Sequence, residues 1–83
     1  MPQLPLPGSI LPNGATVVDS RPAFPDYPAD SERGREFVVL AVREDSACPF
    51  VTWRGTNRDG SVSTYWGHYC PTLAEAVEDF TDR

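Results

Sequence analysis

The chain has 83 residues, which is enough for one domain and too few for two. Apolar residues make up 40% of it and aromatic residues 11%, so it can form a folded core. No apolar run approaches the roughly 18 residues of a membrane-spanning helix, and the proline-rich N-terminus lacks the regions of a signal peptide. We therefore expect a cytoplasmic protein with no membrane contact.

The net charge is −5, and all seven basic residues are arginine. An acidic chain repels the phosphate backbone, so we expect no nucleic-acid partner. The same charge is compatible with an acidic mimic of nucleic acid. Arginine without lysine, beside many alanines, glycines and prolines, is typical of proteins from GC-rich genomes.

Residues 1–14 form a proline-rich arm, which proline's fixed φ should keep extended. Its apolar anchors would be Leu4, Leu6, Ile10 and Leu11. The arm could cover aromatic side chains of its own domain or of a neighbouring copy, because aromatic grooves accept proline. A homo-oligomer formed through residues 1–14 is therefore one predicted assembly, and residues 15–83 are the predicted domain.

Strand patterns begin after the Asn13-Gly14 turn, with a short strand over residues 15–20. The proline- and charge-rich residues 21–35 read as a long loop. Residues 36–43 should form the central strand, with both faces covered. Its two faces would carry Phe37, Val39 and Ala41 on one side, and Val38, Leu40 and Val42 on the other.

A hairpin and a helix complete the pattern. Residues 50–54 and 61–69 pair around an Asp-Gly turn within residues 57–60. Thr72 and Glu75 fit a capping box that opens a helix, and so short a helix needs to dock on the sheet. Its apolar stripe would be Leu73, Ala76, Val77 and Phe80, and its acidic face Glu75, Glu78, Asp79 and Asp82.

The predicted fold class is therefore α+β. It is a small antiparallel β-meander of three to four strands, with one C-terminal amphipathic helix packed on one face. The acidic helix face is either the solvated side of that helix or a contact for a basic partner. Asp79 and Asp82 favour a partner, because the helix dipole disfavours negative charge near a helix C-terminus.

The hairpin register places Cys48 roughly opposite Cys70, with His68 on the same face as Cys70. These are three potential zinc ligands, and a small zinc-stabilised module is one alternative. Close Cys-x-x-Cys pairs and a fourth ligand are missing, so we expect no metal and no cofactor. A cross-strand disulfide is another alternative, but a reducing compartment favours two thiols.

We find no catalytic motif in the sequence. His68 is the sole histidine, and neither a glycine-framed serine nor a phosphate-cradling loop is present. We therefore expect no enzyme.

The predicted hairpin carries more aromatic surface than one short helix can cover. Strand alternation places Thr64, Trp66 and His68 on one face, and Tyr65 and Tyr69 on the other. Tyrosine, tryptophan and arginine dominate binding hot spots. The predicted partner-binding residues are Trp53, Arg54, Arg58, Tyr65, Trp66 and Tyr69.

Residues 14–20 and 36–83, with Trp66-Gly67-His68-Tyr69 and the following helix as signature, resemble small uncharacterised bacteriophage proteins of GC-rich Gram-positive hosts. The resemblance implies a phage-type accessory protein that inhibits or redirects a host factor by protein–protein interaction in the host cytosol. It implies no role for any single residue. The alternative is a self-associating structural protein whose arm packs on a neighbouring chain.

Overall fold

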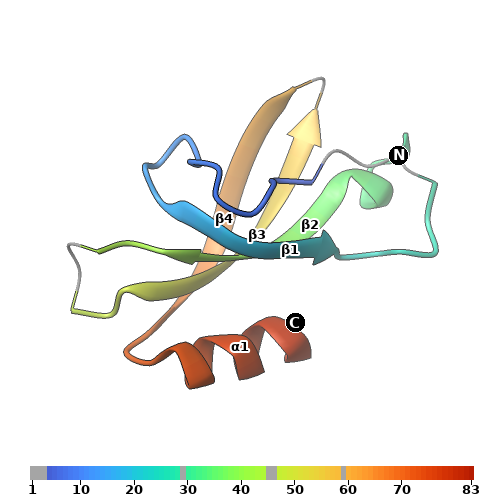
Figure 1. The fold of residues 1–83 in the computed structure, drawn as a ribbon. Coiled ribbons are helices and arrows are strands. Elements are labelled where there is room, and N and C mark those ends of the chain that lie inside the picture. Colours follow the sequence, from blue (N-terminus) through green and yellow to red (C-terminus); the bar gives the residue numbers. More distant parts are fainter. Residues whose placement is uncertain (1–3, 29, 45–46, 59) are drawn as a thin grey trace.

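The computed structural model describes residues 4–28, 30–44, 47–58 and 60–83 (Figure 1). Its four antiparallel strands lie in the order β1-β2-β3-β4. Each strand pairs with the next along the chain, and one helix packs on the sheet, which confirms the predicted α+β meander. The elements are β1 (Thr16–Pro22), β2 (Glu36–Val42), β3 (Phe50–Arg58), β4 (Ser61–Cys70) and α1 (Leu73–Asp82).

Two strands run at least two residues further than their sequence patterns predict. β1 extends to Pro22, which pairs with Phe37 of β2. β3 extends to Arg58, which pairs with Ser61 of β4. The predicted Asp-Gly turn is Asp59-Gly60, of which Asp59 lies outside the described residues. Gly60 has a φ of 88°, a backbone conformation that favours glycine.

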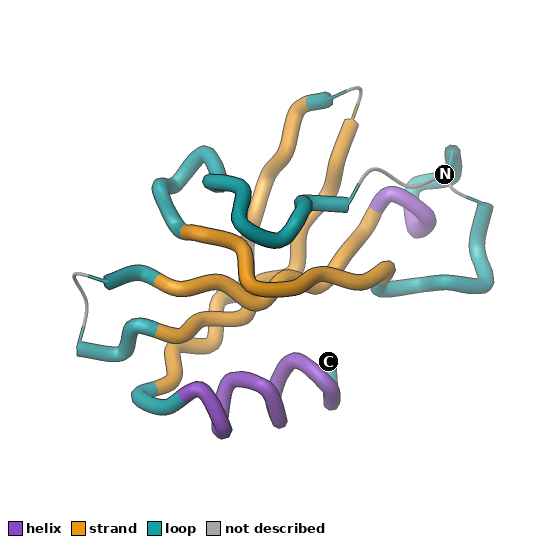
Figure 2. The backbone as a smooth tube through the Cα atoms, in the orientation of Figure 1, coloured by secondary structure: helices purple, strands orange, loops and turns teal. Residues whose placement is uncertain are grey.

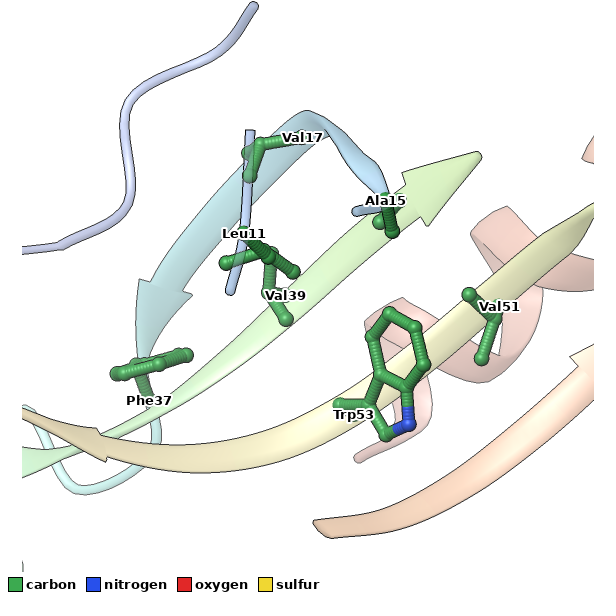
Figure 3. Close-up of a cluster of buried hydrophobic side chains, with 8 residues drawn as sticks. Leu11, Ala15, Val17, Phe37, Val39, Val51 and Trp53 are labelled. Carbon is green, nitrogen blue, oxygen red and sulfur yellow. The ribbon is translucent and has the colours of Figure 1, made fainter. Parts of the chain in front are cut away.

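The larger hydrophobic cluster lies on the sheet face opposite α1 (Figure 3). The odd-numbered side chains of β2, with Phe37 the largest, face this cluster, whereas Val38 and Leu40 face α1. Phe37 packs over Gly55, where an added Cβ would lie 2.5 Å from the ring. The cluster contains Leu11, Ala15, Val17, Phe37, Val39, Ala41, Val51 and Trp53.

The N-terminal arm completes this cluster within the same chain. Leu11 is only 5% exposed, and Leu4 packs against the cluster. The Gly8 N–H donates to the Val17 carbonyl and the Val17 N–H to that of Ser9, both at 2.8 Å. The arm and α1 therefore lie on opposite sides of the sheet (Figure 1), and residues 4–14 share a core with residues 15–83.

Residues 23–28 and 30–35 belong to a long connection between β1 and β2 that includes the short 3-10 helix η1 (Arg33–Arg35) (Figure 2). Two guanidinium groups contact the Phe24 ring, Arg33 at 5.1 Å and Arg54 at 5.2 Å from its centroid. Tyr27 packs edge-on against Phe24. These cation–π contacts fold the loop back on the sheet, as a loop of this length requires.

Helix α1 begins at the predicted N-cap. The Thr72 hydroxyl accepts a hydrogen bond from the Glu75 N–H at 3.3 Å. Ala76 and Phe80 are buried against Val38 and Leu40 of β2. The other two residues of the predicted apolar stripe are exposed, and these are Leu73 and Val77.

Candidate functional site

β4 is interrupted by a β-bulge at Trp66. Thr52 pairs with His68 but Arg54 pairs with Tyr65, so two residues of β4, Trp66 and Gly67, lie opposite one residue of β3. Trp66 has a φ of 53°, in the left-handed region that bulky residues rarely adopt.

Gly67 leaves room for the buried Trp53 ring at this bulge. A Cβ at Gly67 would lie 2.6 Å from the Trp53 Nε1, so only glycine lets that indole pack over β4. A glycine inside a strand pattern often marks a bulge. Gly67 was therefore the one sequence signal that could have located the bulge.

The bulge reverses the phase of the side chains along β4. Tyr65 and His68 both lie on the face covered by α1, whereas Thr64 and Tyr69 lie on the opposite face. The predicted grouping of Tyr65 with Tyr69, and of Thr64 with His68, is therefore wrong. One extra residue in a strand moves every side chain beyond it to the other face.

Two exposed aromatic rings lie three residues apart on β4. Trp66 is 69% exposed and Tyr69 is 53% exposed. Each is supported by a second ring in an edge-to-face contact, Trp66 by Tyr65 with centroids 5.0 Å apart and Tyr69 by Trp53 at 6.2 Å. The exposed rings are thus held in defined orientations.

Trp53 does not belong to this surface, contrary to the sequence-based prediction. It is 6% exposed and lies in the core cluster (Figure 3). β3 is an inner strand between β2 and β4, and the arm covers the face to which Trp53 points. The ring is therefore surrounded by the core.

The two arginines of the predicted set make ion pairs within the chain. Arg54 bonds to Glu36 at 3.2 Å, and the Tyr65 hydroxyl donates to the same carboxylate oxygen at 3.2 Å. Burial, together with the charge of Glu36, raises the pKa of Tyr65, so this phenol remains a hydrogen-bond donor. The exposed Arg58 pairs with Glu32 of the loop before β2.

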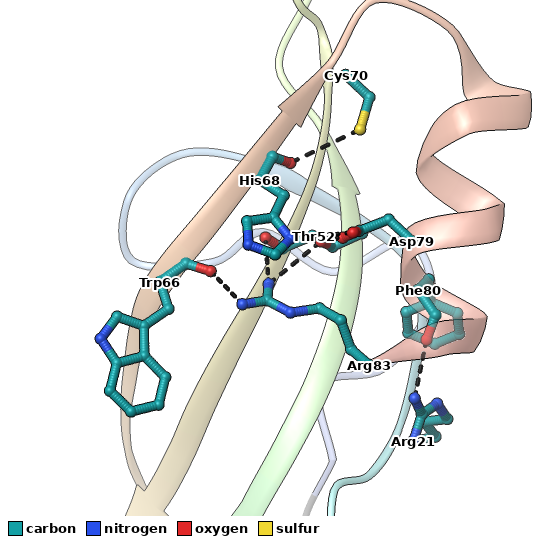
Figure 4. A network of polar contacts seen from close by, with 8 residues as sticks. All are labelled: Arg21, Thr52, Trp66, His68, Cys70, Asp79, Phe80 and Arg83. Carbon is teal, nitrogen blue, oxygen red and sulfur yellow. Dashed lines mark hydrogen bonds and ion pairs between the residues drawn. The ribbon is translucent and has the colours of Figure 1, made fainter.

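A polar network connects the bulge to α1 (Figure 4). The Asp79 carboxylate accepts a hydrogen bond from the Thr52 hydroxyl and lies 3.0 Å from the Nδ1 of His68. Arg83 donates to the Thr52 carbonyl at 3.0 Å and to the Trp66 carbonyl at 2.5 Å. The end of α1 is thereby fixed to both β3 and β4.

Asp79 faces the sheet, with 28% of its side chain exposed, so its assignment to the solvated acidic face is wrong. Burial alone would raise the pKa of Asp79, but the hydrogen bonds from Thr52 and His68 and the positive charges of His68 and Arg83 outweigh burial. The pKa is therefore lowered, and the carboxylate stays charged. The apolar pattern alone could not reveal this orientation, because the partners of Asp79 come from other strands.

The orientation of α1 divides the remaining acidic residues. Asp79 points toward β4 and Phe80 toward β2, so a spacing of roughly 100° per residue places Glu75 and Asp82 on the β4 side and Glu78 toward solvent. We call Glu75, Asp79 and Asp82 the acidic row. Two of its members act on the end of β4: burial, followed by the charges of Asp79 and Glu75, raises the pKa of the Cys70 thiol.

The three candidate zinc ligands do not form a metal site. Cys70 pairs with Phe50, two residues from Cys48, and Cys48 contributes to the raised pKa of Cys70, so the two cysteines lie near one another without being directly opposite. The bulge in β4 contributes to this offset. His68 directs Nδ1 to Asp79, and both cysteines are thiols. Within the described residues, no group of three or more His, Cys, Asp or Glu side chains could hold a metal ion.

Thr52, Asp79 and His68 have the residue types of a catalytic triad but a different hydrogen-bond order. A nucleophilic hydroxyl donates to the histidine, whereas the Thr52 hydroxyl donates to Asp79. Thr52 is also fully buried and cannot contact a substrate. This arrangement fixes the helix to the sheet.

In the part of the chain that the structure describes, no helix has the length and apolar character needed to cross a membrane. The most prominent surface feature of β4 is its pair of supported, exposed rings, Trp66 at the bulge and Tyr69 on the face opposite α1. Comparisons with protein-family models, curated proteins and solved structures find no match to this chain.

Proposed function

We propose that this chain is a non-enzymatic protein-binding domain with Trp66 at the centre of its contact surface. The observation that carries the proposal is a tryptophan that is 69% exposed on a left-handed backbone. That backbone costs a bulky residue roughly 1–2 kcal/mol, and so exposed a ring recovers little of the cost by burial. Strained residues cluster at functional sites, and tryptophan is the most typical binding hot spot.

The neighbouring contacts support a preorganised surface. Tyr65 supports the Trp66 ring, Arg83 holds its carbonyl, and Tyr69 adds a second exposed ring on the same strand. Side chains that are already ordered lose less conformational entropy when a partner binds.

The resemblance to small phage proteins supports a host protein as the partner, inhibited or redirected in the host cytosol. The net charge of −5 favours a partner with a basic surface. Self-association through the arm has less support, because Leu11 occupies the core of its own chain.

The test is affinity capture from a host lysate with the wild-type chain, Trp66→Ala and the control Tyr27→Ala. Tyr27 is another exposed aromatic residue, located in the loop between β1 and β2. The wild type and the control should capture the same protein, and Trp66→Ala should bind that purified protein about thirtyfold or more weakly, as expected for a hot spot. Equal affinity of a folded Trp66→Ala variant would refute the proposal.

A further inference from the structure

The two edges of the sheet differ in how they are protected. The outer edge of β1 is paired with the arm through Gly8, Ser9 and the isolated bridge between Ile10 and Thr16. β4 is the other edge strand, and among the described residues its backbone pairs with no strand besides β3, although side chains of Arg83 and Cys70 donate to the Trp66 and His68 carbonyls. In an antiparallel pair, alternate residues of an edge strand direct their N–H and C=O groups outward. β4 therefore presents such groups without a neighbouring strand.

The sequence of β4 also lacks the usual protection of an edge. Its ten residues, Ser61–Cys70, include no proline and no lysine, arginine, aspartate or glutamate. Natural edge strands are usually short, charged, interrupted by proline or covered. The bulge at Trp66 is the one such device in β4, and it leaves the regular pairs from Ser61 to Tyr65 intact. A long, open edge of this kind is a template for strand addition.

The charge beside this edge indicates what would pair with it. The acidic row lies on the β4 side of α1, and Asp79 and Glu75 are close enough to β4 to act on His68 and Cys70, so a segment added to that end of β4 would pass close to Glu75. Arginine or lysine in that segment would gain attraction from these carboxylates and could contact the exposed face of the Trp66 ring. A second copy of this chain would instead bring another acidic row and another charge of −5 to the same place.

We infer that the partner contributes an extended, arginine- or lysine-rich segment that pairs with the outer edge of β4 as a fifth strand. This inference rests on the proposed function and specifies the kind of partner. Backbone hydrogen bonds to β4 would provide affinity, and the acidic row and Trp66 would provide the preference for basic side chains.

The experiment titrates the full-length, ¹⁵N-labelled chain with a capped peptide of alternating arginine and valine. A peptide with glutamate in place of arginine is the charge control. An extended peptide has two hydrogen-bonding edges, and an added strand uses only one of them. We therefore use two N-methylated forms of the arginine peptide, each with the N–H groups of one edge blocked. General charge attraction would be the same for both forms, whereas strand addition would be lost in only one. The readouts are the backbone amide shifts and the hydrogen-exchange protection of β4.

We expect the arginine peptide to protect alternate amides in β4 and leave β1 unchanged. One N-methylated form should bind about tenfold or more weakly and the other should bind like the parent, since strand addition depends on backbone hydrogen bonds. Glu75→Gln should weaken binding about two- to fivefold, as for an exposed ion pair. Glu78→Gln, the matched control on the solvent side of α1, should have little effect.

The inference is overturned if the glutamate peptide binds equally well, if both N-methylated forms bind like the parent, or if β4 shows no protection. It is also overturned if light scattering shows that the chain is a dimer and that Ser63→Arg, which introduces a charge on β4, makes it a monomer. A second copy of the chain would then be the occupant of the β4 edge. Loss of the host protein by Trp66→Ala, together with an unprotected β4, would refute strand addition and leave the proposed function standing.

Discussion

Arg83 donates a hydrogen bond to the main-chain carbonyl of Trp66 at 2.5 Å and a second one to the Thr52 carbonyl at 3.0 Å. The residue that caps the end of α1 therefore holds the backbone of the bulge in β4. Burial lowers the pKa of Arg83 and the Asp79 carboxylate partly restores it, so the guanidinium group remains charged. The docking of the helix and the position of the exposed indole are thus coupled.

Replacing Arg83 tests this coupling. Arg83→Met keeps most of the aliphatic stem but removes the donors, which leaves two carbonyls without these bonds. We expect the free energy of unfolding to fall by about 1–3 kcal/mol, measured by urea denaturation. Arg43→Met, at the end of β2, is the control and should change stability by less than about 0.5 kcal/mol. Equal midpoints for the two variants would contradict the coupling.

Asp79 should make stability depend on acid. Its folded-state pKa lies below the ordinary value of 3.8, so its contribution is present above about pH 4 and is lost as pH falls through the folded-state pKa. Asp79→Asn should cost about 1–3 kcal/mol near neutral pH, because the bonds from Thr52 and His68 lose their charged acceptor. The difference from wild type should shrink as pH falls through the lowered folded-state pKa of Asp79, because the wild-type carboxylate then also becomes neutral.

Urea denaturation at several pH values gives this comparison directly. Asp82→Asn removes an exposed carboxylate from the same helix and should change stability by less than about 0.5 kcal/mol at neutral pH. A difference between wild type and Asp79→Asn that stays constant down to acid pH would show that the charge of Asp79 is not what stabilises the fold.

Local sequence signals predicted the elements well but not how their faces meet. The alternation of residues 36–43 identified the central strand, and Thr72 identified the start of α1, because both patterns depend on near neighbours. The bulge at Trp66 depends on how Trp53 packs over Gly67, a contact between strands. The rotation of α1 depends likewise on hydrogen bonds from another strand to Asp79. The binding residues were therefore grouped on the wrong faces.

The contact between Phe37 and Gly55 predicts a strong and specific interaction. Gly55→Ala would place a Cβ 2.5 Å from the Phe37 ring, which is almost fully buried and has little room to move. Such overpacking should cost about 1–3 kcal/mol. In the double variant Gly55→Ala/Phe37→Leu, the smaller side chain relieves the clash with the ring and leaves only the 2.7 Å approach of the Cβ to the Ser63 carbonyl oxygen. A thermodynamic cycle should therefore show a loss smaller than the sum of the single losses, and strict additivity would contradict the contact.

The arm should contribute to stability as a part of the core. Leu11→Ala should lower the free energy of unfolding by about 2–5 kcal/mol, because Leu11 is 5% exposed within the main cluster. Leu6→Ala is the matched control, since Leu6 is 71% exposed on the same arm, and it should change stability by less than about 0.5 kcal/mol. The loss caused by Leu11→Ala should be independent of protein concentration, whereas an arm exchanged between chains would make stability concentration-dependent.

Trp66 offers a way to separate the strain of the bulge from its function. Trp66→Ala removes the ring but keeps a Cβ on a backbone with a φ of 53°, whereas Trp66→Gly removes both. If the bulge is strained, the glycine variant should be about 1 kcal/mol more stable than the alanine variant, although glycine normally lowers stability in a strand. Both variants should lose the captured partner. A less stable glycine variant would mean that the left-handed conformation costs little, and the exposed indole would then be the only evidence for selection at this position.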